Sequence, residues 1–391
     1  MQVVSSDQLI KEKLDFASHM QRSIDLACNR VTTTPNPRVG CVLVDSADCI
    51  VGEGWHLAVG QPHAEAMALE RAGGKAKDST AFVSLEPCSH TGRTAPCSEA
   101  LIAAGVKRVV IASVDPDSRV NGNGIARLET AGIEVIHLQD FEESARQINR
   151  GYIKRMRESL PFVRCKLAMS LDGRTAMASG ESKWITGAAA RADVQFLRAQ
   201  SCAIVTGIET ILKDDPALNI RPQDIDGSVI IEGMLDETRQ PLRAIVDSKL
   251  RTPGTARAVS LPGQIVIFTA LSEIDEAGDT LSDSVEIEIA DKPQQRVDLQ
   301  SVLESLADKY FCNEVLIEAG PTLSGAFITA GLVDELIIYV AGKFMGDEAL
   351  PLLRLPGIEK LADAIAVEIK DVIRVGNDFR ITAVPGSTAE A

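Results

Sequence analysis

Short apolar runs rich in β-branched residues alternate with helical patterns in the first part of the chain, and this alternation restricts the possible folds most. The runs suited to strands are VGCVLVD (39–45), TAFVSLE (80–86), KRVVIASV (107–114) and GIEVIHL (132–138). Helix candidates lie near 62–72, 97–104 and 122–131, and each ends at a glycine or a turn. Such alternation predicts an α/β fold in which helices cover a mostly parallel sheet.

The pattern breaks at Pro161 and then restarts. The preceding segment, QINRGYIKRMRESLPFV (147–163), is basic, and a new strand pattern begins with FVRCKLAMS (162–170). Further strands are predicted at AIVTG (203–207), LRAIVDS (242–248), QIVIFTA (264–270) and EVLIEAGP (314–321). The acidic segment PQDIDGSVIIEGMLDETRQP (222–241) is interpreted as an excursion that can form a hairpin. Because 391 residues exceed one typical domain, we predict two α/β domains, 1–159 and 160–391.

Charge is distributed unevenly between the two predicted domains. Residues 1–158 hold 18 Lys and Arg against 20 Asp and Glu, and the remaining residues hold 22 against 35, for a net charge of −15. Nucleic acids are bound through basic surfaces, so the acidic second part argues against such a partner there. For the near-neutral first part, charge alone leaves RNA open.

The sequence shows no membrane-spanning or targeting signal. No stretch approaches the roughly 20 apolar residues that a membrane-spanning helix needs. The segment MQVVSSDQLIKEKLDF (1–16) lacks the basic region and apolar core of a signal peptide. The eight cysteines are too sparse and irregular for a disulfide framework. We therefore expect a cytoplasmic protein without a membrane partner.

Potential metal ligands lie close together in QPHAEAMALE (61–70) and LEPCSHTGRTAPC (85–97). Prolines at helix starts place His63 and Cys97 at the beginnings of two helices, and Cys88 follows a strand. Three such ligands leave the fourth position of a zinc ion open to water, as in catalytic sites. Glu65 can then carry a proton from that water to a leaving amine. This pattern predicts hydrolytic deamination of an amidine-like ring carbon, whereas a fourth ligand, His90, would make a closed structural site.

Small, glycine and hydroxyl residues gather around a lysine and a tryptophan in KLAMSLDGRTAMASGESKWITG (166–187). The segments IVTGIETILKDDPALNIR (204–221) and VLIEAGPTLSGAFI (315–328) are typical of strand–glycine–helix units. The second can direct backbone N–H groups at a pyrophosphate. Neither matches the Gly-x-Gly-x-x-Gly fingerprint, and ordinary β–α turns remain the alternative.

The pattern of potential metal ligands in residues 61–97 resembles a known family. The HAE motif with a downstream PC and a second cysteine is similar to the cytidine deaminase superfamily. The longer cysteine spacing, with TPNPRVG (34–40), GEGWH (52–56) and DPDSRVNGNG (115–124), resembles the deaminase half of the bifunctional riboflavin-biosynthesis deaminase/reductase family. The resemblance implies one zinc ion held by His63, Cys88 and Cys97, with Glu65 moving protons. It further implies a substrate pocket lined by Asn36, His56, His90, Arg93 and Asp115. The family often has DPNP where this chain has DPDS, so Asp117 stands in the place of that asparagine.

The second part resembles the reductase half of the same family, with a dihydrofolate-reductase-like α/β fold that follows a cytidine-deaminase-like α/β/α domain. The resemblance implies NADPH contacts from Ala168, Trp184, Thr210, Asp214, Ser248, Gly320, Pro321, Thr322, Leu323, Ser324, Gly325 and Ala326. It implies substrate contacts from Lys166, Ser182, Arg198, Leu218, Arg221 and Glu318. Two of these, Arg198 and Arg221, are cations in an acidic part of the chain, as binding of a sugar phosphate requires.

The resemblance implies a bifunctional enzyme. The first half would deaminate 2,5-diamino-6-(5-phosphoribosylamino)pyrimidin-4(3H)-one. The second would use NADPH to reduce the ribosyl side chain, giving 5-amino-6-(5-phosphoribitylamino)uracil. Its partners would be these pyrimidine ribotides and, through the reductase domain, a second copy of the chain in a homodimer or higher homo-oligomer. Two alternatives are a nucleic-acid deaminase acting on a flipped-out base and a non-catalytic zinc protein with a nucleotide-sensing domain.

Overall fold

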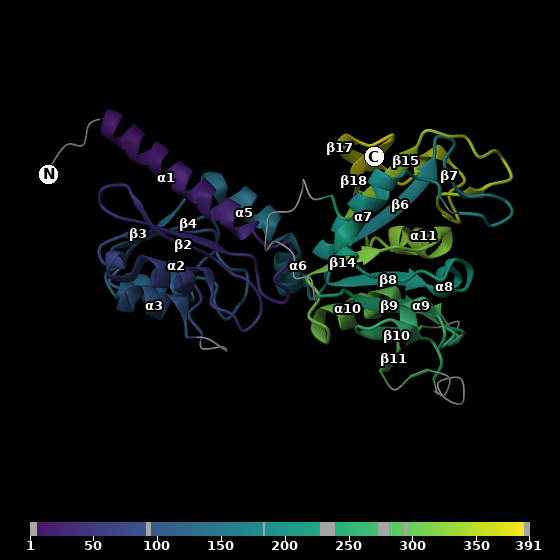
Figure 1. Ribbon diagram of the computed structural model, residues 1–391, viewed down its shortest axis with the longest axis horizontal. Coiled ribbons are helices and arrows are strands. Elements are labelled where there is room, and N and C mark those ends of the chain that lie inside the picture. Colours follow the sequence, from purple (N-terminus) through teal and green to yellow (C-terminus); the bar gives the residue numbers. More distant parts are fainter. Residues whose placement is uncertain are drawn as a thin grey trace. The chain divides into compact units, whose positions relative to one another are not determined.

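The chain folds into two compact units, one ending at Glu158 and the other beginning at Ser159 (Figure 1). The computed structural model describes residues 6–90, 95–182, 184–226, 239–272, 281, 282, 284–292 and 296–386. The division between the units lies at the position where the strand pattern of the sequence restarts. No helix in these ranges combines the length and the apolar character needed to cross a membrane.

A five-stranded sheet forms the centre of the first unit, in the order β2-β1-β3-β4-β5. The three strands β3, β4 and β5 are parallel, but β1 is antiparallel to both of its neighbours. The expectation of a mostly parallel sheet is therefore correct for only one side of it. In chain order the helices and strands are α1 (Ser6–Ala27), β1 (Gly40–Val44), β2 (Ile50–Trp55), α2 (Ala64–Ala72), β3 (Thr80–Val83), α3 (Cys97–Ala103), β4 (Arg108–Ile111), α4 (Asn123–Thr130), β5 (Glu134–His137), α5 (Glu142–Ile148) and α6 (Arg150–Glu158).

Alternating side chains of this sheet enter two separate apolar cores. Leu43 and Val83 pack with residues of α2, α3 and α4 on one face. Val42 and Phe82 pack with residues of α1 and α5 on the other face. Because successive strand residues point to opposite faces, both faces are buried under helices and the unit is an α/β/α sandwich.

The strand β2 was not predicted, and its glycines explain both the omission and the packing. A β-carbon on Gly52 would lie 2.3 Å from the Ala68 carbonyl oxygen, and one on Gly54 would lie 2.1 Å from that of Ala64. The backbone of α2 thus contacts the backbone of β2 directly, which only glycine permits. This close contact fixes the helix that carries His63 and Glu65.

A nine-stranded sheet forms the centre of the second unit, in the order β11-β10-β9-β8-β14-β6-β15-β18-β17. Neighbours from β11 to β15 are parallel, and β18 and β17 are added antiparallel. Its principal elements are β6 (Phe162–Ser170), β7 (Arg174–Ala176), α7 (Ala188–Gln200), β8 (Ala203–Gly207), α8 (Ile208–Asp214), β9 (Leu242–Val246), α9 (Arg257–Ser260), β10 (Ile265–Thr269), β11 (Val285–Ile289), α10 (Leu299–Asp308), β14 (Glu314–Ile317), α11 (Pro321–Thr329), β15 (Glu335–Ala341), β17 (Val367–Val375) and β18 (Asp378–Pro385). The shorter elements are η1 (Gly73–Ala76) and η2 (Gln139–Phe141) in the first unit, and η3 (Pro222–Asp224), β12 (Asp291–Lys292), β13 (Arg296–Val297), β16 (Leu350–Pro351) and η5 (Leu361–Asp363) in the second.

All five strands predicted after Pro161 are present in this sheet. The apolar segment 332–342 forms β15, whose side chains are mostly buried, so it is a core strand. Most of the segment interpreted as an acidic hairpin, residues 227–238, lies outside the described residues; its start is the 3-10 turn Pro222–Asp224. The parallel strands β6, β8 and β14 are adjacent, so their carboxyl ends and the loops that follow lie at one edge.

Candidate active sites

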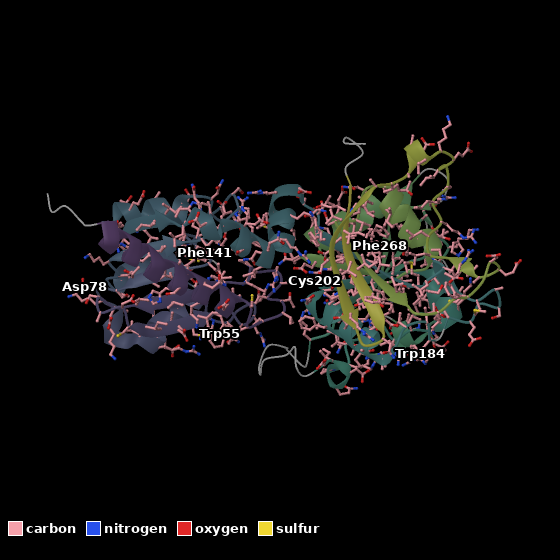
Figure 2. The ribbon with its side chains drawn as sticks, turned by 90° about the horizontal axis from the view of Figure 1, so that it is seen from above. Trp55, Asp78, Phe141, Trp184, Cys202 and Phe268 are labelled. Carbon is pink, nitrogen blue, oxygen red and sulfur yellow. The ribbon has the colours of Figure 1, made fainter. Side chains whose placement is uncertain are left out.

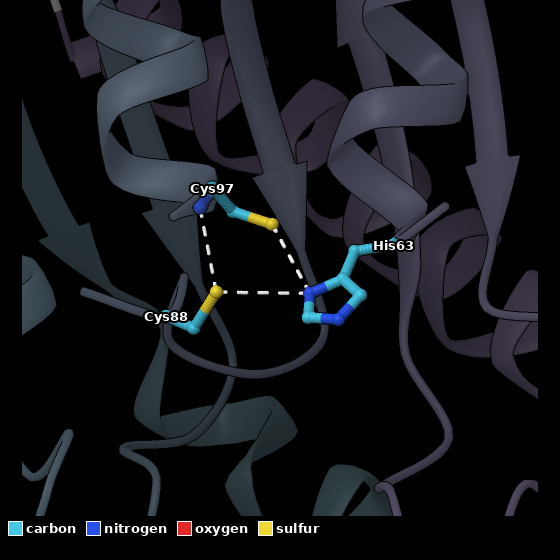
Figure 3. Close-up of side chains that lie close together, drawn as sticks. All are labelled: His63, Cys88 and Cys97. Carbon is cyan, nitrogen blue, oxygen red and sulfur yellow. Dashed lines mark hydrogen bonds between the residues drawn. The ribbon is translucent and has the colours of Figure 1, made fainter. Parts of the chain in front are cut away.

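The three predicted metal ligands of the first unit converge on one point (Figure 3). Their ligand atoms all lie within 4.8 Å of one another. The His63 Nδ1 atom is 3.3 Å from the Cys97 sulfur and 3.6 Å from the Cys88 sulfur. His63 is the N-cap of α2 and Cys97 is the first residue of α3, while Cys88 lies in the loop after β3. The sequence prediction of two helix starts facing one loop is confirmed.

The cluster stabilises a thiolate. Hydrogen bonds from the Cys97 thiol, from His63 and from the Cys97 backbone N–H lower the pKa of Cys88 to about 4. The Cys97 thiol donates to Cys88 and is buried, so its own pKa is raised well above the ordinary value. The two opposite shifts describe one proton shared by the pair and kept by Cys97. The hydrogen bond with Cys88 also raises the pKa of His63.

Glu65 lies in the first turn of α2 beside this cluster but is not one of the three converging ligands. Its side chain is buried, at 3% exposure. Burial raises the pKa of the carboxyl group to about 7, and the negative charge of Cys88 adds to the effect. A carboxyl group with such a pKa can accept and return a proton near neutral pH.

His56 and Asn36 lie together next to the ligand cluster. The Asn36 side-chain amide is 2.9 Å from His56 Nε2, and His56 Nδ1 is 3.1 Å from the Pro62 carbonyl oxygen. Donation of Nδ1–H to that carbonyl leaves Nε2 as the acceptor for the amide. The ring centres of His56 and His63 are 5.2 Å apart. Burial lowers the pKa of His56, which favours this neutral form.

Asp115 is buried in the loop after β4 and is anchored by a residue that sequence reasoning missed. The Tyr152 hydroxyl, on α6, donates to an Asp115 carboxylate oxygen at 3.0 Å. The backbone N–H of Asp117 donates to the same oxygen at 2.9 Å. Burial raises the pKa of Asp115 to about 6. Nothing in the spacing of residues 115 and 152 indicates this contact.

A second residue that was missed, Glu86, holds the rest of this loop. Its buried carboxylate accepts hydrogen bonds from the backbone N–H groups of Gly122, Gly124 and Ile125 at 2.9–3.2 Å. A β-carbon on Gly124 would lie 2.1 Å from the Pro87 carbonyl oxygen, so the start of α4 packs directly on the strand-to-cysteine turn. Glu86 thereby links the loop of Asp115 to the loop of Cys88.

The remaining two predicted residues of this pocket differ in how far they can be placed. His90 is not part of the ligand cluster in the described part of the chain, and its buried Nδ1 atom has no hydrogen-bond partner there. The interpretation of His90 as a fourth ligand is therefore not supported. Arg93 lies outside the described residues.

In the second unit, Glu318 is the centre of the predicted substrate group. It follows β14 and forms a two-point ion pair with Arg198 of α7, at 2.6 and 3.0 Å. Both side chains are about one-tenth exposed. Burial alone would raise the pKa of Glu318, but the positive charge of Arg198 lowers it, and Lys166 and Arg221 contribute in the same direction. The structure thus brings four of the six predicted substrate residues into one charged cluster.

The other two predicted substrate residues flank that cluster. The Ser182 hydroxyl donates to the Asp214 carboxylate at 3.0 Å, which joins a predicted substrate residue to a predicted cofactor residue. Leu218 has a backbone φ of +47°, a conformation that leucine rarely adopts. Its side chain is buried, so packing holds the backbone in place.

The predicted cofactor residues of α8 and α11 lie close together at the ends of β8 and β14. A β-carbon on Gly320 would lie 3.9 Å from the Thr210 hydroxyl, and one on Gly207 would lie 3.1 Å from the Leu323 side chain. Gly320 is the N-cap of α11, with Pro321 as its first residue and Thr322 next. The first turn of α11 therefore meets the start of α8.

Two other residues of the predicted Gly320–Ala326 segment, Ser324 and Gly325, pack against the protein. A β-carbon on Gly325 would lie 2.1 Å from the Arg354 carbonyl oxygen, and Ser324 is fully buried and donates to the Ala319 carbonyl. Ala326 follows Gly325 within α11. The Ser324 and Gly325 side of the helix faces the protein, and the Gly320 end faces α8.

Trp184 is 66% exposed, so it is not part of the core. Figure 2 labels its position in the second unit. The Arg191 guanidinium lies over the ring, 4.4 Å from its centre. The two remaining predicted cofactor residues, Ala168 and Ser248, each accept a hydrogen bond at the backbone carbonyl oxygen. The donors are the hydroxyls of Thr175, at 3.0 Å, and Thr269, at 3.3 Å.

Comparisons with known proteins match both units. The family model described as cytidine and deoxycytidylate deaminase zinc-binding region matches residues 15–113, and the RibD C-terminal domain matches residues 161–381. The riboflavin biosynthesis protein RibD of Escherichia coli is 48% identical over 361 residues, covering 92% of this chain and 96% of that protein. The chain belongs to the RibD family.

Solved RibD structures agree with this assignment over nearly the whole chain. Acinetobacter baumannii RibD superposes with a TM-score of 0.85 at 42% identity, covering 95% of this chain and 99% of that one. A diaminohydroxyphosphoribosylaminopyrimidine deaminase/5-amino-6-(5-phosphoribosylamino)uracil reductase from Thermotoga maritima has a TM-score of 0.82 at 30% identity, with 95% and 99% coverage. As a RibD protein, the chain is a bifunctional deaminase and reductase of riboflavin biosynthesis that uses Zn²⁺ and NADPH.

The donor atoms of the RibD chain fit these cofactors. One imidazole nitrogen and two sulfurs are the atoms that zinc prefers, and one of the sulfurs is already favoured as thiolate. In the second unit, Gly320 at the start of α11 offers a helix beginning without a side chain, beside the Thr210 hydroxyl. Such a helix start suits a pyrophosphate.

Proposed function

We propose that the first unit deaminates 2,5-diamino-6-(5-phosphoribosylamino)pyrimidin-4(3H)-one and that the second reduces the ribosyl side chain of the product with NADPH, giving 5-amino-6-(5-phosphoribitylamino)uracil. The two activities named for the Thermotoga maritima relative support these substrates. The observation that carries the proposal is the pairing, in one chain, of a three-ligand cluster beside a buried carboxyl group with a separate cationic cluster around Glu318.

In the deaminase, His63, Cys88 and Cys97 would hold the zinc ion, which supplies the Lewis acidity that activates a water molecule. Glu65 takes a proton from the attacking water and returns it to the departing amine. Burial raises the pKa of the Glu65 carboxyl group, which favours acceptance of that proton.

The neighbouring polar residues of the first unit would hold the pyrimidine ring. His56 keeps its neutral form through the Pro62 carbonyl and Asn36. The buried Nδ1 of His90 is an atom for which a substrate group can be the partner. Asp115, which is buried in the loop that Glu86 joins to the loop of Cys88, would contact the same substrate, and Arg93 would contribute charge to its phosphate end.

In the reductase, bound NADPH supplies the hydride, and Thr210, Asp214 and the Gly320–Ala326 segment would hold it, with Ala168, Trp184 and Ser248. Arg198 balances the charge of Glu318, so Lys166 and Arg221 would be the cations for the sugar phosphate, with Arg221 exchanging its exposed partner Asp224 for it. The Asn219 side-chain oxygen is buried and accepts no hydrogen bond within the described ranges. A substrate hydroxyl or N–H can be its donor.

Two further points concern the setting of the enzyme. A homodimer through the second unit is supported by β17, an edge strand on which Val367, Ile369 and Val372 are about half exposed. Sedimentation of Ile369→Lys and Val372→Lys variants tests it, and an unchanged mass would exclude this strand. A cytoplasmic location is supported by the eight cysteines, all of which are free thiols.

A coupled assay tests the order of the two reactions. Zinc-loaded protein receives NADPH and only the undeaminated ribotide, so NADPH is consumed only after deamination. Glu65→Gln should abolish NADPH consumption, retain zinc and still reduce supplied deaminated ribotide. Glu70→Gln, an exposed residue on the same helix, is the matched control. Near-normal ammonia release by Glu65→Gln would overturn the role of Glu65.

A further inference from the structure

The loop Leu218–Arg221 carries two of the proposed substrate residues but has no regular secondary structure. It lies between α8 and the turn Pro222–Asp224. At its start, Leu218 has a φ of +47°. A non-glycine residue in this region persists only when the surrounding structure holds it there. The groups that hold this loop therefore decide where Arg221 is placed.

Side chains from outside the loop satisfy its backbone groups one after another. The Asn219 carbonyl accepts from Arg198 Nη1 at 2.9 Å. The Ile220 N–H donates to the Gln240 side-chain oxygen at 2.8 Å, and the Gln240 amide donates back to the Ile220 carbonyl at 3.2 Å. The Arg221 N–H donates to the Gln195 side-chain oxygen at 2.9 Å. Gln240 thus pairs with Ile220 as a neighbouring strand would.

The two glutamines come from separate elements. Gln195 is on α7, is only 2% exposed, and lies three residues before Arg198, on the same side of the helix. Gln240 lies just before β9 and is half-buried. A buried amide oxygen that accepts one backbone N–H fixes the position of that N–H, because an unpaired partner would be costly.

The position of Arg221 matters because its guanidinium is not fixed by burial. The side chain is 40% exposed and pairs with Asp224 at 2.5 Å. An exposed pair of this kind is worth little and can be exchanged for a phosphate. What keeps Arg221 beside the cluster around Glu318 is therefore its backbone.

We propose that Gln195 and Gln240 are positioning residues of the reductase, which hold the backbone of residues 219–221 so that Arg221 meets the phosphate of the ribotide. This inference rests on the proposed substrate role of Arg221. Neither glutamine belongs to the proposed substrate or cofactor sets. They act on affinity for the ribotide and leave NADPH binding and the deaminase unchanged.

Substitution by methionine tests this, since methionine keeps the size of glutamine and removes its hydrogen bonds. Gln195→Met should raise the reductase KM for the deaminated ribotide about ten-fold, the scale of one lost hydrogen bond to a partly buried N–H. Gln240→Met, which loses two hydrogen bonds to Ile220, should raise it at least as much. The kcat, the Kd for NADPH measured by fluorescence, and ammonia release should stay within about two-fold. Gln200→Met is the matched control, because no hydrogen bond among the described residues joins Gln200, on the same helix, to this loop.

Two further variants separate positioning from general damage. Gln240→Glu keeps the acceptor for the Ile220 N–H, so it should recover part of the affinity that Gln240→Met loses. In a double-mutant cycle, Gln195→Met should add little to the KM of Arg221→Ala, because the glutamine acts through Arg221. Full additivity would overturn the inference.

The outcomes also distinguish this inference from the proposed function. If Arg221→Ala leaves the KM for the ribotide unchanged, the proposed role of Arg221 is wrong. If Arg221→Ala raises that KM but neither methionine variant does, the role of Arg221 stands and the positioning role of the glutamines is wrong. Equal losses in ribotide affinity, NADPH affinity and kcat would indicate a purely structural role and overturn the inference as well.

Discussion

In the first unit, the proposed metal ligands come from one stretch, His63 to Cys97, and two of them lie at the starts of α2 and α3. In the second unit, the charged cluster joins Lys166, Arg198 and Glu318 with Arg221, from four separate segments of the chain. The first site gathers thiol, imidazole and carboxyl groups that exchange protons. The second gathers charged groups, and two of them, Arg198 and Glu318, neutralise each other inside the protein.

This difference determines how each site tolerates the loss of its ligand. The thiols and the imidazole of the first cluster can exchange protons with one another, so the charge of that cluster can adjust. Arg198 cannot lose its proton, so Glu318 must neutralise it permanently. The first site therefore depends on an added ion for activity, and the second depends on its internal ion pair for stability.

Metal removal should give the largest contrast between the two sites. Chelation, or Cys97→Ala, should reduce ammonia release to background, while reduction of supplied deaminated ribotide continues. Added zinc should restore ammonia release to the chelated wild type but not to the variant. Cys49→Ala, at an exposed cysteine outside the cluster, is the matched control. Parallel loss of both activities would show that the metal is needed for the folding of the whole chain.

The Arg198–Glu318 pair should show the second-largest effect. Glu318→Ala leaves a buried guanidinium without its carboxylate, which typically costs about 3–5 kcal/mol. We expect the second unit to unfold at lower temperature in calorimetry and the reductase to be lost, while ammonia release persists below that transition. Glu209→Ala breaks an exposed pair with Arg251 and should change stability by less than about 1 kcal/mol. Similar effects of both variants would contradict the distinction between the pairs.

The sequence predicted the first site more completely than the second, for reasons that the residues show. Pro-Cys and His-x-Glu patterns at helix starts are local, so His63, Glu65, Cys88 and Cys97 could be assigned before their contacts were known. The β-branched runs likewise predicted five strands of the second unit, which are β6, β8, β9, β10 and β14. No local pattern marks Gln195 as the partner of the Arg221 backbone.

Features that depend on tertiary packing could not be predicted. Gly52 and Gly54 form the buried face of β2, and the reason for these glycines is evident only when α2 lies against them. β1 is antiparallel to both β2 and β3, although its apolar, β-branched composition is like that of the parallel strands. Tyr152 and Glu86 contact partners about three dozen residues away in the chain, and no spacing rule relates them.

The pH dependence of stability should reveal the buried carboxyl group of the first unit. Burial raises the pKa of Asp115 from 3.8 to about 6 in the folded state. Between these values the folded state binds more protons than the unfolded state, so stability falls as pH rises, by about 3 kcal/mol in total. Asp115→Asn should remove this slope between about pH 4 and pH 6 in denaturant titrations. An unchanged slope, equal to that of the exposed control Asp140→Asn, would show that Asp115 is ionised throughout.

Tyr152→Phe should give the smallest effect and the sharpest separation of the two sites. The substitution removes one hydroxyl that donates to Asp115 and keeps the buried ring, so it costs roughly 1 kcal/mol. If Asp115 contacts the substrate, the deaminase KM should rise about five-fold, since about 1.4 kcal/mol corresponds to ten-fold. Reductase constants should not change.

The matched control for Tyr152 lies in the other unit. Tyr310 donates to Glu288 at 2.6 Å on the second unit, so Tyr310→Phe removes an equivalent hydroxyl far along the chain from Asp115. It should leave the deaminase KM unchanged. Because α6 leads directly into the second unit, a change in the reductase KM on Tyr152→Phe would contradict the independence of the two sites. That result would show that binding of the two substrates is energetically coupled.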